Sequence, residues 1–161
     1  MDDRHYNPLM LHHWSQTLEA LIEWLALNDT LSDAIVMRRF LDVVRHAPHP
    51  DLTDGLYLHD PFTVDQLLAV GAADTLALSL VGPDNGFFAS RGGTGEYLVS
   101  VVIEGRGEET TAAGMTLTRA IVNALALSLS QPPCLDHGAD LGGDHGYGGF
   151  HAMAVAGATL H

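Results

Sequence analysis

The chain contains no lysine, and its seven basic residues are all arginines. They stand against 20 acidic residues in a chain of 161, which gives a net charge of −13. A protein that binds nucleic acid directly needs a basic surface facing the phosphates, so the composition argues against that function. It argues equally against binding to an anionic membrane surface. We therefore expect any macromolecular partner to be a protein with a basic surface.

Cysteine is nearly absent as well, since Cys134 is the only one, and an intrachain disulfide framework is excluded. The N-terminus is acidic before it becomes apolar, unlike a secretory signal. No apolar run reaches the ~18–20 residues of a membrane span. The nearest candidate, residues 112–129, is interrupted by Arg119 and by several polar residues. These absences lead us to expect a cytoplasmic protein without membrane contact.

Apolar periodicity dominates the N-terminal part of the chain. Between residues 11 and 25, apolar side chains recur every three or four positions, which predicts an amphipathic helix. A second helix follows, which we expect Asp29 or Thr30 to cap and Pro48 to end. Two short-linked amphipathic helices predict an N-terminal α-hairpin over residues 1–47.

The next segment, residues 63–130, has the pattern of an α-β-β-β-α core. Thr63 and Gln66 have the spacing of a capping box, which predicts a short helix that begins there. Alternating apolar residues and Gly-rich turns then predict a three-stranded antiparallel meander, and the fold class is therefore α+β. The three predicted strands are residues 76–81, 87–91 and 96–104.

The final predicted helix, residues 112–130, carries a single charge, Arg119. A helix that is apolar nearly all round is buried on more than one side, whereas a sheet covers only one of its faces. We expect the second face to meet either the α-hairpin or a second copy of the chain in a homodimer. That face consists of Leu117, Ala120, Ala124 and Leu127. The predicted core consists of Tyr97, Val99, Val101, Ile103, Ile121 and Leu125.

One stretch of this core has a family resemblance. The residues from Val99 to Leu129, VSVVIEGRGEETTAAGMTLTRAIVNALALSL, place a strand, a Gly/Glu-rich turn and an Ala/Leu-rich helix in succession. In this order the chain resembles the small phage "ABA sandwich" proteins, over residues 63–130. The resemblance implies a phage-encoded α+β domain and supplies no catalytic residues. Double-stranded RNA-binding domains share the element order, but they need lysines on the last helix, which here offers Arg119 alone.

The C-terminal tail, residues 131–161, is rich in glycine and histidine. One thiolate and three imidazoles there could complete a tetrahedral zinc site, although histidines in a glycine-rich segment are more often simply solvated. The candidate ligands are Cys134, His137, His145 and His151. Histidines near the two ends of the α-hairpin form a second candidate cluster, with ordinary helix-end histidines as the alternative: His12, His13, His46 and His49.

Two glycine-rich segments, Gly92–Gly95 and Gly105–Gly107, could in principle cradle a phosphate. Neither matches a P-loop or a dinucleotide fingerprint, and we interpret both as tight turns. No arrangement of Ser, His and Asp can be argued from the sequence to form a catalytic triad.

The strongest functional indication is the acidic charge, which can imitate a phosphate backbone and occupy a basic groove, although it could also serve only solubility. We predict a non-enzymatic acidic binding protein without a cofactor. In its sharpest form it is a phage-encoded inhibitor of a host nuclease defence, such as an anti-CRISPR protein. The alternatives are a zinc-binding protein or metal-dependent enzyme that uses the tail, and a phage virion or assembly component. The predicted partner-binding residues are Glu96, Glu104, Glu108 and Glu109.

Overall fold

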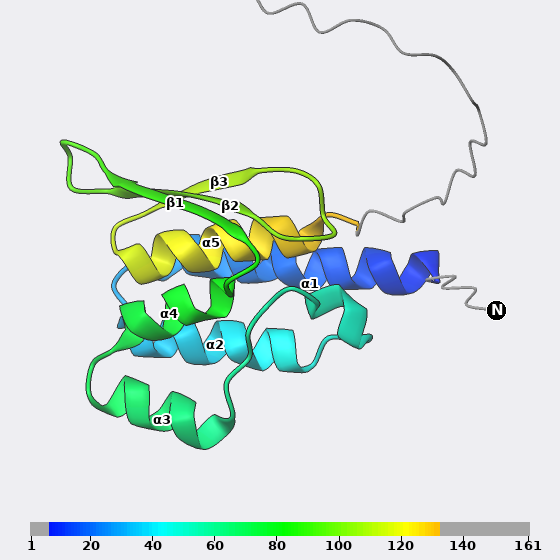
Figure 1. The fold of residues 1–161 in the computed structure, drawn as a ribbon, viewed down its shortest axis with the longest axis horizontal. Helices are drawn as coiled ribbons and strands as arrows, with labels where there is room; N and C mark the ends of the chain where they lie inside the picture. The colour runs from blue at the N-terminus through cyan, green and yellow to red at the C-terminus, as the bar shows by residue number, and fades with distance from the viewer. Residues whose placement is uncertain (1–6, 133–161) are drawn as a thin grey trace, which may run out of the picture.

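The computed structural model describes residues 7–132, which form an α+β fold with helices first, then an antiparallel sheet, then a last helix (Figure 1). The three strands follow one another in the order β1-β2-β3, as a meander requires. The elements are α1 (Pro8–Leu27), α2 (Asp33–Arg45), the 3-10 helix η1 (Pro50–Thr53), α3 (Pro61–Ala69), α4 (Ala73–Val81), β1 (Gly86–Arg91), β2 (Tyr97–Val102), β3 (Thr110–Gly114) and α5 (Leu117–Ser130).

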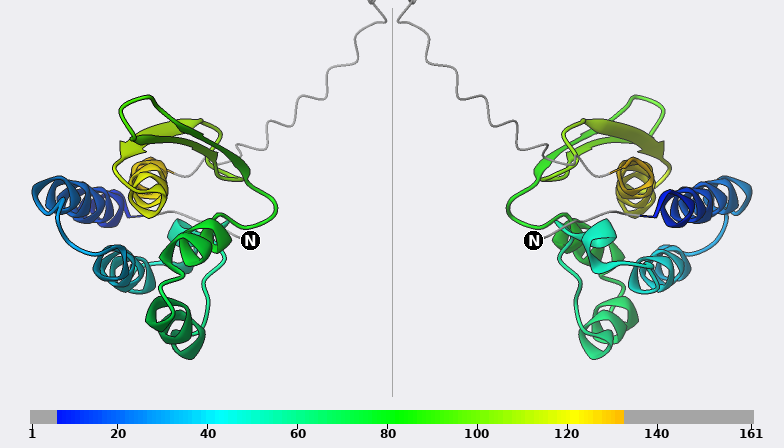
Figure 2. Two further views of the ribbon diagram at one scale, coloured as in Figure 1. Left: turned by 90° about the vertical axis from the view of Figure 1, so that its left-hand side faces the viewer. Right: turned by 90° about the vertical axis from the view of Figure 1, so that its right-hand side faces the viewer.

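Helix α5 lies at the centre of the molecule. The sheet covers one side of it, α1 lies beside it, α2 and α4 form the next layer, and α3 is outermost (Figure 2). The prediction that this helix is buried on two sides is therefore confirmed. The face predicted for a dimer is not available for it, because Ala120 and Ala124 are fully buried and the N-terminal α-hairpin covers α5 within the same chain.

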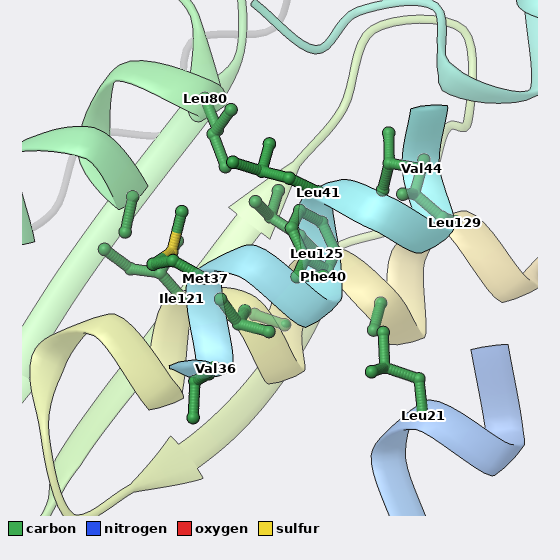
Figure 3. Packing of buried hydrophobic residues seen from close by; sticks show 14 of the residues in the cluster. Leu21, Val36, Met37, Phe40, Leu41, Val44, Leu80, Ile121, Leu125 and Leu129 are labelled. Atoms are coloured by element: carbon green, nitrogen blue, oxygen red, sulfur yellow. The ribbon is translucent and has the colours of Figure 1, made fainter. Parts of the chain in front are cut away.

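The core is built where α2 crosses α5. Phe40 and Met37 of α2 are completely buried, and they lie close to Ile121 and Leu125 of α5 (Figure 3). Five of the six residues that the sequence predicts for the core are completely buried. The sixth, Tyr97, is only partly buried, because it lies at the end of β2.

Of the two helices of the α-hairpin, α1 has a side-chain cap and α2 has none. The side chain of Asn7 accepts a hydrogen bond of 3.0 Å from the N–H of Leu9, and Pro8 occupies the first turn of α1. Helix α2 begins after Ser32, so the predicted caps at Asp29 and Thr30 are wrong. Those two residues lie in the turn between the helices, which ends with an extended backbone at Ser32.

Helix α3 also starts earlier than the capping box predicts. Asp60 is its cap, and its Oδ1 accepts hydrogen bonds of 3.0 Å from the N–H groups of both Phe62 and Thr63. Pro61 follows at the first helical position, where its fixed φ suits a helix and its missing N–H costs nothing. The hydroxyl of Thr63 donates to the Asp60 carboxylate at 2.6 Å, so it does not cap the helix itself.

The predicted first strand, residues 76–81, is wrong, because these residues belong to helix α4. Leu76 and Leu80 are completely buried and lie one helical turn apart, whereas Leu78 between them is 41% exposed. A strand would place all three on one face. Residues i and i+4 share a face in a helix and also in a strand. In so short a segment, apolar residues at alternate positions therefore fit either structure.

The third strand of the sheet is β3, in a segment that the sequence assigns to a turn and to the start of the last helix. Gly105 and Gly107 adopt positive φ in the connection from β2, and Val101 of β2 pairs with Thr110 of β3. Helix α5 begins only at Leu117. Its N-cap is Thr116, whose side chain accepts a hydrogen bond from the N–H of Arg119. The sheet therefore has three antiparallel strands, as predicted. The predicted first strand is helical, however, and the third strand lies further along the chain, at β3.

Candidate functional site

The four predicted partner-binding glutamates are all exposed, but they do not form one surface. Glu104 lies two residues after the end of β2, and Glu108 and Glu109 directly precede β3, so these three share the β2–β3 loop. Glu96 lies before the first residue of β2, in the turn that joins it to β1. A six-residue strand spans about 20 Å, which places Glu96 at the opposite end of the sheet.

Glu104 takes part in an acidic pocket with two aspartates. Asp54 comes from the loop after η1 and Asp84 from the turn between α4 and β1, so three separate segments each contribute one carboxylate. The pocket has a volume of 460 Å³, and among the described residues no arginine lines it. Its remaining lining residues are Gly55, Leu56, Tyr57, Gly82, Pro83 and Gly105.

Asn85 holds the three segments of this acidic pocket together. Its amide Nδ2 donates to the carbonyl of Gly55 at 2.7 Å and also to the carbonyl of Val81, while its Oδ1 accepts from the N–H of Glu104 at 2.8 Å. The N–H of Tyr57 adds a bond of 3.0 Å to the carbonyl of Leu80. Because these bonds fix the backbone on every side, the pocket is formed before any ligand arrives.

Gly55 makes the close packing beside the pocket possible. Its φ of +88° is unfavourable for residues with a side chain, and an added Cβ would lie 2.8 Å from Cγ2 of Ile103. The sequence signals for this site are the Asp-Gly pair at Asp54 and the Pro-Asp-Asn-Gly turn at Asp84. Both are ordinary turn motifs, and the two aspartates stand 30 positions apart in the chain, so the sequence does not indicate that they line one pocket.

Arg106 lies in the glycine-rich turn that could have cradled a phosphate, but it points into the protein. Its side chain is only 4% exposed and donates to the carbonyls of Gln131 at 2.7 Å and Leu129 at 3.3 Å, and also to that of Leu52. A guanidinium at the carbonyl end of α5 suits the helix dipole. Arg106 therefore anchors the β2–β3 loop to α5. The glutamates of this loop are exposed, whereas its arginine is buried.

Arg119 is buried in a similar way at the other end of α5. It donates to the carbonyls of Asn28 at 2.9 Å and Leu31 at 2.6 Å, and its Nε lies 3.7 Å from Oδ1 of Asp33. It fixes the α1–α2 turn against α5. Burial of both arginines removes two of the chain's seven positive charges from the surface.

A serine–histidine contact in the structure does not have the geometry of a nucleophile. Nε2 of His59 lies 2.8 Å from Oγ of Ser79, but the Ser79 hydroxyl also donates to the carbonyl of Leu76 at 2.7 Å. With its own proton committed, Ser79 accepts from His59, and His59 therefore acts as donor and does not activate the hydroxyl.

The histidines of the α-hairpin do not form a metal site. In residues 7–132, no group of three or more His, Cys, Asp or Glu side chains is placed to hold a metal ion. Nδ1 of His46 lies 2.7 Å from the carbonyl of Asp42, and Nδ1 of His49 accepts from the N–H of Asp51, so both bond to nearby backbone. The tail ligands Cys134, His137, His145 and His151 lie outside the described residues, and zinc binding there stays a prediction.

Comparison with known proteins finds no matching family model, curated protein or solved structure. The resemblance to phage ABA-sandwich proteins consequently stays a prediction that rests on the residues alone. None of the helices within the described range 7–132 is long and apolar enough to cross a membrane.

Proposed function

We propose that this protein is a non-enzymatic acidic binding protein whose acidic pocket receives a cationic side chain from a basic protein partner. The observation that carries the proposal is the pocket itself, whose lining includes Asp54, Asp84 and Glu104 and, in the described structure, no arginine. The net charge of −13 supports it at the scale of the whole chain.

The chemistry of the pocket suits a guanidinium group. Carboxylates accept charge-assisted hydrogen bonds from arginine, and these are roughly twice as strong as neutral ones. Tyr57 lines the same pocket and is 58% exposed, so its ring is available for a cation–π contact. A volume of 460 Å³ lies within the range of ordinary ligand sites and exceeds what one arginine side chain needs.

Glu108 and Glu109 extend the negative charge from Glu104 along the β2–β3 loop. Such a concentration of one sign of charge accelerates the encounter with a basic surface and excludes acidic partners. In the sharpest form of the proposal, the chain is a phage-encoded inhibitor that occupies the nucleic-acid groove of a host nuclease defence. The carboxylates then stand where phosphates would bind, and the resemblance to phage proteins supports this form.

Two variants with equal charge test the proposal, with an arginine-rich peptide as the probe. The pocket variant is Asp54→Asn/Asp84→Asn/Glu104→Gln. The control variant, Glu19→Gln/Glu23→Gln/Asp29→Asn, removes three exposed carboxylates on and after α1. Each change takes the net charge from −13 to −10, since three negative charges are removed.

We expect the pocket variant to bind the peptide about tenfold or more weakly than the control variant, which corresponds to about 1.4 kcal/mol. Isothermal titration calorimetry measures both affinities, and thermal melting verifies that both variants fold. Equal affinities of the two variants would show that net charge alone attracts the peptide, and would refute the pocket as its binding site.

A further inference from the structure

Strand β1 is an open edge of the sheet. All six of its residues are exposed, and within the described chain it pairs with β2 alone. Helix α5 contacts β2 and β3, so it leaves the inner side of β1 uncovered. Edge strands of natural proteins are commonly protected by lysine, proline or a bulge, yet the sequence of β1, GFFASR, contains neither lysine nor proline, and its register with β2 is unbroken.

The direction of the free backbone groups follows from the hairpin. The N–H of Gly92 donates to the carbonyl of Glu96 at 2.8 Å, so these two residues form a hydrogen-bonded pair. In an antiparallel ladder such pairs alternate, and the even-numbered residues of β1 therefore bond to β2. The N–H and C=O groups of Phe87, Ala89 and Arg91 point outward, and they form a regular row on the open edge.

We propose that two copies of this protein associate through β1, antiparallel about a two-fold axis at Ala89, to form a continuous six-stranded sheet. This register pairs Ala89 with the same residue of the second copy, and Phe87 with Arg91. Every outward N–H and C=O group of the three residues then has a partner, so the edge is complementary to itself.

The side chains favour the same register. Phe87 and Arg91 share the inner face of the sheet with Val101 and Tyr97, and in this register they become direct cross-strand neighbours between copies. The Arg91 guanidinium lies 5.4 Å from the centroid of the Tyr97 ring in its own chain, so its side-chain stem is the part that meets Phe87 of the second copy. Phe88, which is 63% exposed, lies on the outer face. In this register it becomes a diagonal neighbour of the second copy's Phe88, within reach of an aromatic contact.

The charge distribution permits the contact although each copy carries −13. From Asn85 to Gly95 there is no acidic residue, and Arg91 is the only charge in that stretch. The acidic pocket and the β2–β3 loop lie beyond the start of β1, outside the paired residues. One short strand buries less surface than the ~1,600 Å² of a standard interface, so we expect a dimer of micromolar affinity.

Sedimentation equilibrium in 0.2 M NaCl, where charge repulsion is largely screened, measures the association. We expect the mass to rise from 17.2 kDa toward twice that value between about 10 and 500 μM, within the micromolar range of affinity that the small interface predicts. Ala89→Pro removes one outward N–H without removing a bond to β2, and should keep the protein monomeric with an unchanged fold. A wild-type protein that stays monomeric over the whole range overturns the proposal.

A crosslinking experiment tests the register. In a Cys134→Ser background, Ala89→Cys would place two thiols on a hydrogen-bonded pair with Cα atoms about 5.5 Å apart, which a disulfide can span. The matched control is Thr94→Cys, which is also exposed on the same hairpin but far from its counterpart in this register. Oxidation should crosslink Ala89→Cys and leave Thr94→Cys monomeric. Equal crosslinking of both variants, or of neither, overturns the proposed register.

Discussion

Gly114 ends β3 at the point where the sheet comes closest to the backbone of α5. A Cβ on this residue would lie 2.4 Å from the backbone nitrogen of Ala120, nearer than real Cβ atoms approach. The clash is with backbone, so no side-chain rotation can relieve it. The short connection from β3 to α5 therefore depends on glycine at this position.

We predict that Gly114→Ala lowers the free energy of unfolding by about 2 kcal/mol or more, because the sheet and α5 must move apart. Gly93→Ala is the matched control, since a Cβ there meets no atom within 4 Å. It should change stability by less than about 0.5 kcal/mol. Urea unfolding measures both, and similar losses in the two variants would contradict the close approach.

Asn85 and Arg106 show how single polar residues position the proposed site. Asn85 bonds to three chain segments, and Arg106 turns its charge away from the loop that displays Glu104. Neither role is visible in the sequence, because each depends on partners that lie far away along the chain. The exposure of Glu104 is predictable, since the alternation over residues 96–104 places it on the polar face, although β2 itself ends at Val102.

At the scale of elements, the amphipathic helices α1 and α2 and the hairpin of β1 and β2 are predictable from periodicity and turn residues. The segment of β3, TTAAG, is not, because it is a strand only through its pairing with β2. Tertiary pairing overrides weak local preference in such short segments. The same limit applies to α4, where nine residues are too few to separate the two periodicities.

Helix α3 depends on a charged cap, which makes its stability sensitive to acid. Hydrogen bonds from the Thr63 hydroxyl and from the N–H groups of Thr63 and Phe62 hold the pKa of Asp60 below its ordinary value of 3.8. Because the pKa is lowered in the folded state, the stabilisation is complete above pH 3.8. It is lost as the pH falls through the folded-state pKa.

We predict that Asp60→Asn destabilises the protein at pH 7, since the amide can still cap the helix but carries no charge. The difference from the wild type should shrink as the pH falls below 3.8, because the carboxylate then binds protons in the unfolded state before it does so in the folded state. Urea unfolding at several pH values measures this difference. A difference that stays constant from pH 7 to pH 3 would contradict the charged cap.

Packing of α2 against α5 forms part of the buried core of the helical layers. Ile121 is completely buried in this contact. We predict that Ile121→Ala lowers the free energy of unfolding by about 2–5 kcal/mol through cavity formation. Leu27→Ala serves as the control, because Leu27 is 76% exposed at the end of α1. If Ile121→Ala lowers the free energy of unfolding by less than about 0.5 kcal/mol, α5 is not part of the packed core.

At the scale of the whole molecule, the fold separates two surfaces. The acidic pocket and the β2–β3 loop lie at one end of the sheet, and the uncharged edge of β1 runs from that end toward the hairpin tip, which projects from the body (Figure 1). The two proposed associations therefore use separate surfaces of the molecule.

Salt should affect the two associations in opposite directions. We predict that binding of an arginine-rich peptide weakens steeply between about 50 and 200 mM NaCl, mainly through a slower association rate. The dimer should strengthen over the same range, because salt screens the repulsion between two copies of charge −13. Surface plasmon resonance and sedimentation measure the two effects. Peptide binding that is independent of salt would assign the acidic charge to another role.

If the acidic pocket binds a cation, an NMR titration of the wild-type protein with an arginine-rich peptide should locate the binding there. We expect the largest backbone amide shifts at Gly55, Gly82 and Gly105, which line the pocket. Shifts centred on the carboxylates of α1, or spread evenly over every acidic residue, would contradict it.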